Sequence, residues 1–178
     1  MKEIAPEYAI KVSYPLERFH AYQGDTNDCG AYCIAIASNS LYNIPLVNAA
    51  ALASELSRRG LPDRIPGWVL FPWGVVGTFR RLGLRARWRV GARLPRLFDN
   101  VRRNLITIVI LGEPLRFVNR KWEGWSHYKI LTTWEPEREL GFVDPATSNA
   151  TGMTWQTLEE FRRQWTWMGR QIIEVWGP

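Results

Sequence analysis

A segment that is apolar on nearly every side covers residues 31–37, directly after Cys29. A helix with no polar face belongs in the middle of a core. Asn27 or Asp28 precedes it and can act as the N-cap, because a short side-chain acceptor can bond the free amides of the first turn. The pattern therefore predicts a buried helix that starts at Cys29.

Other segments have helical character. Pro45 suits the first turn of a helix over residues 45–59, and Gly60 suits the position just past its end. An amphipathic pattern predicts a later helix over residues 155–165, with Thr154 placed to cap it. Two further helices are predicted between these, over residues 68–82 and 94–104.

Strand-like segments dominate the second half of the chain. Residues 105–111 are rich in β-branched side chains and end at Gly112, which predicts a buried strand. Residues 8–22 are predicted as an extended lead-in. The remaining predicted strands are 84–90, 171–176, and a hairpin formed by 128–134 and 139–143 around a polar turn. Helices first and strands later predict an α+β fold.

Length and composition limit the class of protein. The chain has 178 residues, 46% apolar and 22% charged, which predicts one soluble globular domain over residues 1–178. Residues 1–10 do not resemble a signal peptide, and the apolar stretches are too short or too interrupted to span a membrane. Two cysteines four residues apart argue against a disulfide scaffold. We therefore expect a cytoplasmic protein.

Charge adds one open question. The net charge is +6, and much of the excess lies in the Arg-rich stretch of residues 80–103. Arg85, Arg87 and Arg89 would share one face of a strand. A solvated face is one interpretation, and a patch for an anionic partner such as nucleic acid, an acidic peptide or a membrane surface is the other. No compact nucleic-acid motif accompanies the stretch.

The start of the buried helix carries the candidate chemistry. A thiol at a helix N-terminus lies at the positive end of the helix dipole, which favours the nucleophilic thiolate, so Cys29 is a candidate nucleophile. Thiol catalysis needs a base, and the chain has two histidines. His20 lies in the lead-in, where a surface or packing role is expected. His127 starts the first predicted hairpin strand and is the better candidate.

Two more residues complete the candidate site. A hairpin turn centred between Glu135 and Pro136 would place His127 directly opposite Asp144, whose carboxylate could orient the imidazole. Gln23 lies six residues before Cys29. Its side-chain amide, together with a backbone N–H at the helix start, could stabilise the oxyanion that forms when a carbonyl is attacked.

These motifs resemble those of the papain-like cysteine peptidases, especially the bacteriocin-processing, double-glycine (C39-like) type. The resemblance rests on Gln23, Asp28-Cys29-Gly30 with Cys33, His127-Tyr128 and Asp144-Pro145. It implies a papain-like α+β fold, a peptide or protein substrate and no cofactor. It further implies that Cys29 is the nucleophile, His127 the general base and acid, Asp144 the orienting group and Gln23 the oxyanion donor. Residues 60–104 carry no recognisable motif of that family.

Three alternatives stay open at this stage. An acyl or amide transferase would use the same acyl-enzyme. A catalytically silent peptidase-like module would bind a partner through the Arg-rich stretch. A zinc site with Cys29, Cys33 and His127 lacks the usual ligand spacing and a clear fourth ligand. We expect Cys33 to be a core residue, since a disulfide to Cys29 would distort the helix.

Overall fold

An antiparallel sheet forms the centre of the computed structural model, which describes residues 5–65, 68–118 and 121–177. Its strands run in the order β4-β9-β5-β6-β7-β8, and β1 pairs with β6 outside that path. The strands are β1 (Ile10–Lys11), β4 (Arg85–Arg89), β5 (Ile106–Val118), β6 (Lys121–Glu135), β7 (Glu139–Val143), β8 (Met153–Gln156) and β9 (Ile172–Trp176). A separate small ribbon pairs β2 (Arg64–Ile65) with β3 (Val69–Leu70).

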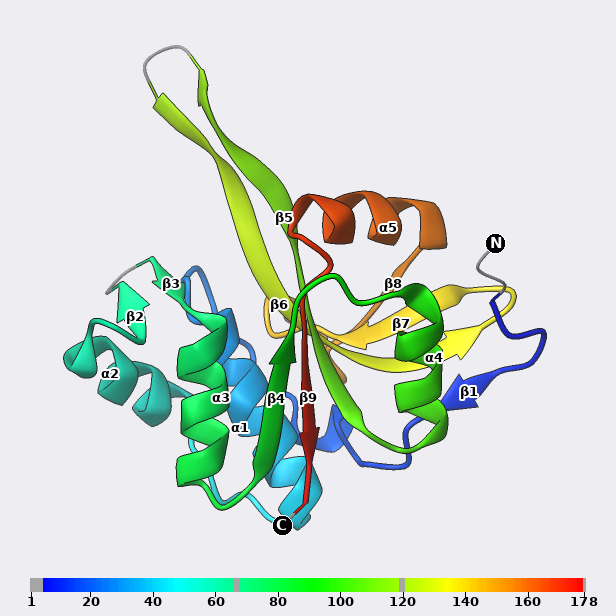
Figure 1. Cartoon of the computed structure of the whole chain (residues 1–178). Coiled ribbons are helices and arrows are strands. Elements are labelled where there is room, and N and C mark those ends of the chain that lie inside the picture. The colour runs from blue at the N-terminus through cyan, green and yellow to red at the C-terminus, as the bar shows by residue number, and fades with distance from the viewer. Residues whose placement is uncertain (1–4, 66–67, 119–120, 178) are drawn as a thin grey trace.

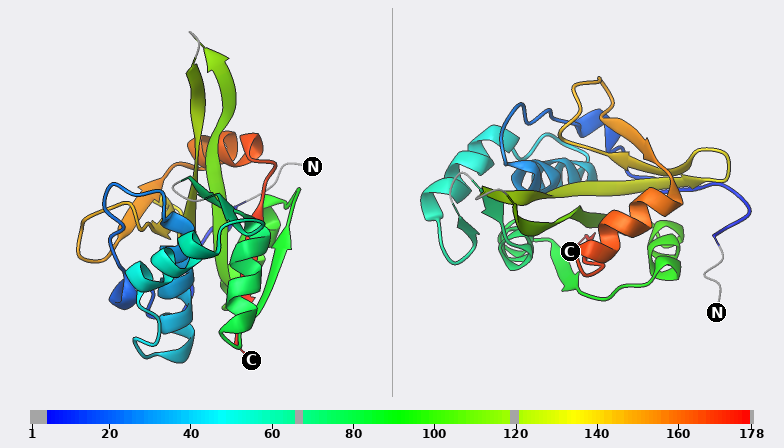
Figure 2. Two further views of the ribbon diagram at one scale, coloured as in Figure 1. Left: turned by 90° about the vertical axis from the view of Figure 1, so that its left-hand side faces the viewer. Right: turned by 90° about the horizontal axis from the view of Figure 1, so that it is seen from above.

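The helices pack around this sheet (Figure 1). They are α1 (Cys29–Tyr42), α2 (Ala49–Arg59), α3 (Pro72–Arg81), α4 (Leu94–Arg102) and α5 (Leu158–Trp167), with a short 3-10 helix at Glu17–Phe19. Figure 1 shows α1, α2 and α3 grouped on one side of the view and α4 and α5 on the other. Strands β5 and β6 continue beyond the body as a long two-stranded arm, which Figure 2 shows from two further directions.

The buried helix α1 joins the helical part to the sheet. Almost all of its residues are buried, as the all-apolar pattern predicts. A Cβ at Gly30 would lie 3.0 Å from the Leu70 side chain, so glycine lets β3 approach the first turn closely. Cys33 is fully buried, and its thiol lies 3.4 Å from the carbonyl oxygen of Tyr128, which confirms the predicted core position.

Most predicted elements are confirmed, and the α+β arrangement with them. Strands β4, β7 and β9 and helix α4 lie within two residues of their predicted bounds. Strands β5 and β6 are longer than predicted because they continue into the arm. His127 therefore lies well inside β6 instead of at its first residue.

Three predicted helices start too early, each for a local reason. Helix α2 starts at Ala49, because the Asn48 side chain accepts a hydrogen bond from the Ala51 N–H and caps it. Helix α3 starts at Pro72, where proline suits the first turn, and the residues before it form β3. Helix α5 is capped by Thr157, so the predicted cap at Thr154 is wrong and that residue belongs to β8.

The predicted hairpin register is also wrong. The structure pairs Glu135 with Glu139 and then, past an irregularity, Ile130 with Val143. Continuing that ladder by one step places Asp144 opposite Lys129, and not opposite His127. His127 is two residues farther along β6, a diagonal neighbour within reach of a carboxylate side chain.

Part of the Arg-rich stretch has a structural partner. Glu174 on β9 is fully buried, and its carboxylate accepts hydrogen bonds from Arg87 and Arg89 of β4 and from Arg96 of α4. Asn100 donates a further bond at 3.1 Å. We call these five residues the Glu174 cluster. These three arginines therefore join β4, α4 and β9.

Across the described ranges, no helix combines the length and apolar character needed to cross a lipid bilayer.

Candidate active site

Cys29 is the first residue of α1 and is 8% exposed. Asp28 holds the N-cap position as predicted, but its side chain makes no capping bond. Its carboxylate instead pairs with Arg64 of β2, a side chain that is almost fully buried. The ion pair ties the start of the cysteine helix to the β2–β3 ribbon. Arg64 was missed in the sequence, because no pattern there links it to Asp28, 36 residues away.

His127 and Asp144 form a close pair. His127 Nε2 lies 2.6 Å from Asp144 Oδ1, and both side chains are largely buried. Cys29 and His127 line the same small cavity, and the thiol lies close enough to raise the pKa of the imidazole. Since Nε2 is used by the carboxylate, Nδ1 is the ring nitrogen left for the thiol. The structure thus brings together three of the four predicted site residues from α1, β6 and the segment after β7.

Electrostatics favours a charged imidazole. Burial by itself lowers the pKa of His127, but hydrogen bonds to Asp144 and Cys29 outweigh it and raise the pKa to about 9. Burial likewise raises the pKa of Asp144, yet the bond to His127 and the nearby Lys129 hold it well below the usual range of a carboxyl. An ionised carboxylate beside an imidazolium is the arrangement that stabilises a neighbouring thiolate.

Asp144 is held from several sides. Its Oδ1 also accepts a hydrogen bond from the Ala146 N–H at 2.9 Å, and its Oδ2 pairs with Lys129 Nζ at 2.9 Å. His20 packs nearby, with Nε2 3.2 Å from the Asp144 carbonyl oxygen. The packing role expected for His20 is therefore confirmed. Lys129 was missed in the sequence, although its spacing of two from His127 on a strand signals a shared face.

Gln23 borders the same small cavity as Cys29. Its backbone N–H donates to the Pro145 carbonyl at 2.9 Å, which fixes the lead-in beside the Asp144 segment. Its Nε2 donates to the Thr26 carbonyl at 2.5 Å, leaving the second N–H of the amide for another acceptor. Gln23 Oε1 is buried without a partner among the described residues. The side chain is thus fixed beside the thiol.

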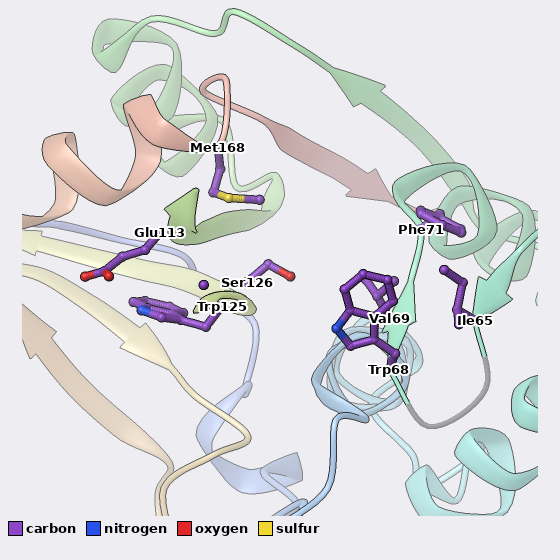
Figure 3. A pocket seen from close by; sticks show the side chains of 9 residues that line it. Ile65, Trp68, Val69, Phe71, Glu113, Trp125, Ser126 and Met168 are labelled. Carbon is purple, nitrogen blue, oxygen red and sulfur yellow. The ribbon is translucent and has the colours of Figure 1, made fainter. Parts of the chain in front are cut away.

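Cys29 lines a small cavity, and a larger cavity adjoins it. The smaller, about 50 Å³, is lined by Gln23, Asn27, Cys29, Trp68, Val69, Leu70, Ser126, His127 and Tyr128. The larger, about 430 Å³, shares Trp68, Val69 and Ser126 with it and is mainly apolar. Figure 3 shows Trp125, Glu113 and Met168 on one side of the larger cavity and Trp68, Val69 and Phe71 on the other. An extended chain that passes the thiol would thus meet an apolar pocket between the arm and the β2–β3 ribbon.

Solved structures share this architecture. A proposed C39-like peptidase from Bacillus anthracis superposes with a TM-score of 0.70 at 15% identity, covering 97% of this chain and 99% of that one. The chain has the fold of the C39-like peptidases. A double-glycine motif protease from an AMS/PCAT transporter, solved in complex with a leader peptide, has a TM-score of 0.59 at 16% identity, with 94% of each chain covered. No family model and no curated protein matches the sequence.

The C39-like fold confirms the papain-like α+β class predicted from the motifs. In the part of the chain that the structure describes, no three His, Cys, Asp or Glu side chains gather in a way that could hold a metal ion. Both cysteines are free thiols. The described residues therefore contain no ligand cluster for the zinc alternative with Cys29, Cys33 and His127.

Proposed function

We propose that this protein is a cysteine peptidase that cleaves peptide bonds through Cys29, His127 and Asp144. The observation that carries the proposal is the 2.6 Å bond between His127 and Asp144, with the Cys29 thiol, at a helix N-terminus, on the same cavity wall as the imidazole. Acyl transfer by a thiol requires a nucleophile, a base next to it and a carboxylate that orients the base. Cys29 and His127 lie on the wall of a cavity that adjoins a larger apolar one.

Each residue has a chemical role in this mechanism. The Cys29 thiolate attacks the peptide carbonyl and forms a tetrahedral intermediate, whose oxyanion is held by the Gln23 amide and the Cys29 backbone N–H. The His127 imidazolium gives its proton to the leaving amine, and the C–N bond breaks to leave a thioester. His127 then takes a proton from water, which attacks the thioester and releases Cys29. Asp144 keeps the imidazole oriented throughout.

The substrate proposed is a peptide or protein segment in an extended conformation. One structural neighbour was solved in complex with a leader peptide. The 430 Å³ cavity beside Cys29 is large enough for a bulky apolar side chain. We therefore infer that such a side chain lies near the cleaved bond.

Thiol alkylation tests the nucleophile directly. With only two cysteines in the chain, mass spectrometry assigns each adduct, and the fully buried Cys33 serves as an internal control. At pH 6, Cys29 should react faster than a free cysteine, because a thiolate–imidazolium pair keeps it ionised. His127→Ala should slow the reaction roughly tenfold or more, as expected for loss of a charge partner.

The matched variant is Cys33→Ala, which should leave both alkylation of Cys29 and peptide cleavage unchanged. Cys29→Ala should abolish cleavage. Slow labelling of Cys29 that does not depend on His127, or cleavage that survives Cys29→Ala, would show the proposal to be wrong.

A further inference from the structure

Lys129 takes no step in the proposed mechanism, yet it contacts the catalytic carboxylate. It stands two residues after His127 on β6, so both side chains leave the same side of the strand. Lys129 Nζ lies 2.9 Å from Asp144 Oδ2, and His127 Nε2 lies 2.6 Å from Asp144 Oδ1. One carboxylate thus bridges an ammonium and an imidazole.

This ion pair differs from a surface pair. The side chain of Lys129 is only 18% exposed and that of Asp144 only 8%. Lys129 Nζ also lies 5.9 Å from the centre of the Phe142 ring, which holds the ammonium on that side. Charges that are largely removed from water interact more strongly than exposed ones.

The carboxylate keeps its orientation without Lys129. Asp144 Oδ1, the oxygen that binds His127, is also fixed by the Ala146 N–H. Loss of the lysine therefore removes a charge without releasing the carboxylate from the imidazole.

Other ionisable groups surround the pair on each packed element. Cys29 and Cys33 face it from α1, Tyr128 lies between His127 and Lys129 on β6, and His20 approaches the Asp144 carbonyl from the lead-in. Of the described residues that pair with Asp144 or face it, Lys129 is the only lysine or arginine.

We propose that Lys129 is a positioning residue that acts through Asp144: it shares the carboxylate's negative charge and so limits how firmly His127 holds its proton. The inference rests on the proposed function, in which one imidazole must both donate and accept protons. A catalytic group does this best when its pKa lies near the working pH. Without the lysine, the full negative charge of Asp144 would stabilise the imidazolium. His127 would then stay protonated in the acyl-enzyme and activate water poorly.

The two histidines of the chain make a direct measurement possible. The imidazole resonances of His127 and His20 can be titrated by NMR in Cys29→Ala protein, which removes the thiolate from the comparison. Lys129→Met should raise the pKa of His127 by about one unit, the size of shift that one close charge produces. Lys129→Arg keeps the charge and should restore the original value.

A kinetic readout accompanies the titration. In enzyme with Cys29 intact, Lys129→Met should move the pH dependence of deacylation upward by the same amount, and Lys129→Arg should not. Lys129→Gln is the second variant if Lys129→Met is not folded, with the melting temperature checked for each. A His127 pKa that stays constant or falls in these folded neutral variants would overturn the proposal.

The two hypotheses fail in different ways. Wild-type protein that cleaves no peptide would contradict the proposed function without altering the NMR titration. An active enzyme whose His127 pKa ignores the charge at position 129 would contradict this inference alone.

Discussion

His127 makes the stability of the protein depend on pH. Its pKa in the folded chain is about 9, above the 6.5 of an unperturbed histidine. A raised folded-state pKa adds stability that is fully present below pH 6.5 and is lost as the pH rises from 6.5 to about 9.

We therefore predict that the free energy of unfolding falls on the order of 2 kcal/mol across this range. Urea denaturation at a series of pH values measures it. His127→Gln should flatten the dependence between pH 6.5 and 9, and an equally steep decline in that variant would assign the effect to another group.

At the scale of residues, the structure places Cys29, His127 and Asp144 close together. A thiol nucleophile needs a base and an orienting acid, and these requirements, with the resemblance of the motifs, predict the three residues; their catalytic roles stay a prediction. The facing arrangement of His127 and Asp144 was predicted from a wrong register. They still meet, because a carboxylate reaches its diagonal neighbour as well as its direct one. The two side chains are therefore close together, as predicted, although they do not lie directly opposite each other.

At the scale of elements, two walls shape the larger cavity. Trp125 of β6 lies on the arm, and Trp68 and Phe71 flank β3 on the other side (Figure 3). The wall with Trp68 and Phe71 comes from residues 60–104, which carry no recognisable motif of the family, and the long β6 carries Trp125 on the other wall.

Trp125→Ala should lower kcat/KM roughly tenfold for peptides with a bulky apolar side chain near the cleaved bond, since a partly lost apolar contact is worth about 1.4 kcal/mol. Peptides with alanine there should change little. Trp167→Ala is the matched control, because that side chain is similarly exposed and does not line the cavity. Equal effects of the two substitutions would mean that the cavity does not bind the substrate.

The Glu174 cluster holds β4, α4 and β9 together. Glu174 is buried, which raises its pKa, but hydrogen bonds from the three arginines and Asn100 lower it to about 2. A lowered carboxyl pKa adds stability that is present above pH 4.5 and is lost as the pH falls towards 2.

Glu174→Gln should therefore destabilise the fold by about 2 kcal/mol at pH 7, because it removes the buried carboxylate that binds three partly exposed arginine side chains and Asn100. Urea denaturation measures the loss. Asp99→Asn removes the exposed pair with Arg103 and should cost no more than about 0.5 kcal/mol. Similar losses in the two variants would contradict the role given to the cluster.

Element boundaries were harder to predict than element types. Several side chains were suited to capping, and the sequence alone does not show which of them is free to do so. Asp28 is engaged by Arg64 and does not cap α1, whereas Asn48 and Thr157 cap α2 and α5. Only the folded chain brings Arg64 to Asp28, across 36 residues.

At the scale of the whole molecule, the two thiols report on different events. Cys29 borders a cavity, whereas Cys33 is fully buried in the core between α1 and the sheet. Labelling of Cys33 therefore requires opening of the core.

In native buffer, Cys33 should be alkylated at least about 10³-fold more slowly than Cys29, given a typical domain stability of 5 kcal/mol or more. Its rate in Cys29→Ala protein should rise with urea in parallel with global unfolding. Rapid labelling of Cys33 without urea would mean that α1 separates from the sheet on its own.

The fold class was predictable from the order of elements, but the assembly of the site was not. The lead-in pairs with β6 through β1 and bonds the segment after β7 through Gln23, so residues far apart in the chain form one wall. Such non-local contacts leave no periodic signal in the sequence.

The contact between His20 and Gly152 limits how this sequence can evolve. Gly152 has a φ of +68°, and a Cβ there would lie 2.1 Å from the His20 ring. A smaller residue at position 20 would remove the clash, but the positive φ would still strain any residue other than glycine at position 152. Position 20 should therefore vary among descendants of this chain while position 152 stays glycine, and any exception at 152 should follow a smaller residue at 20.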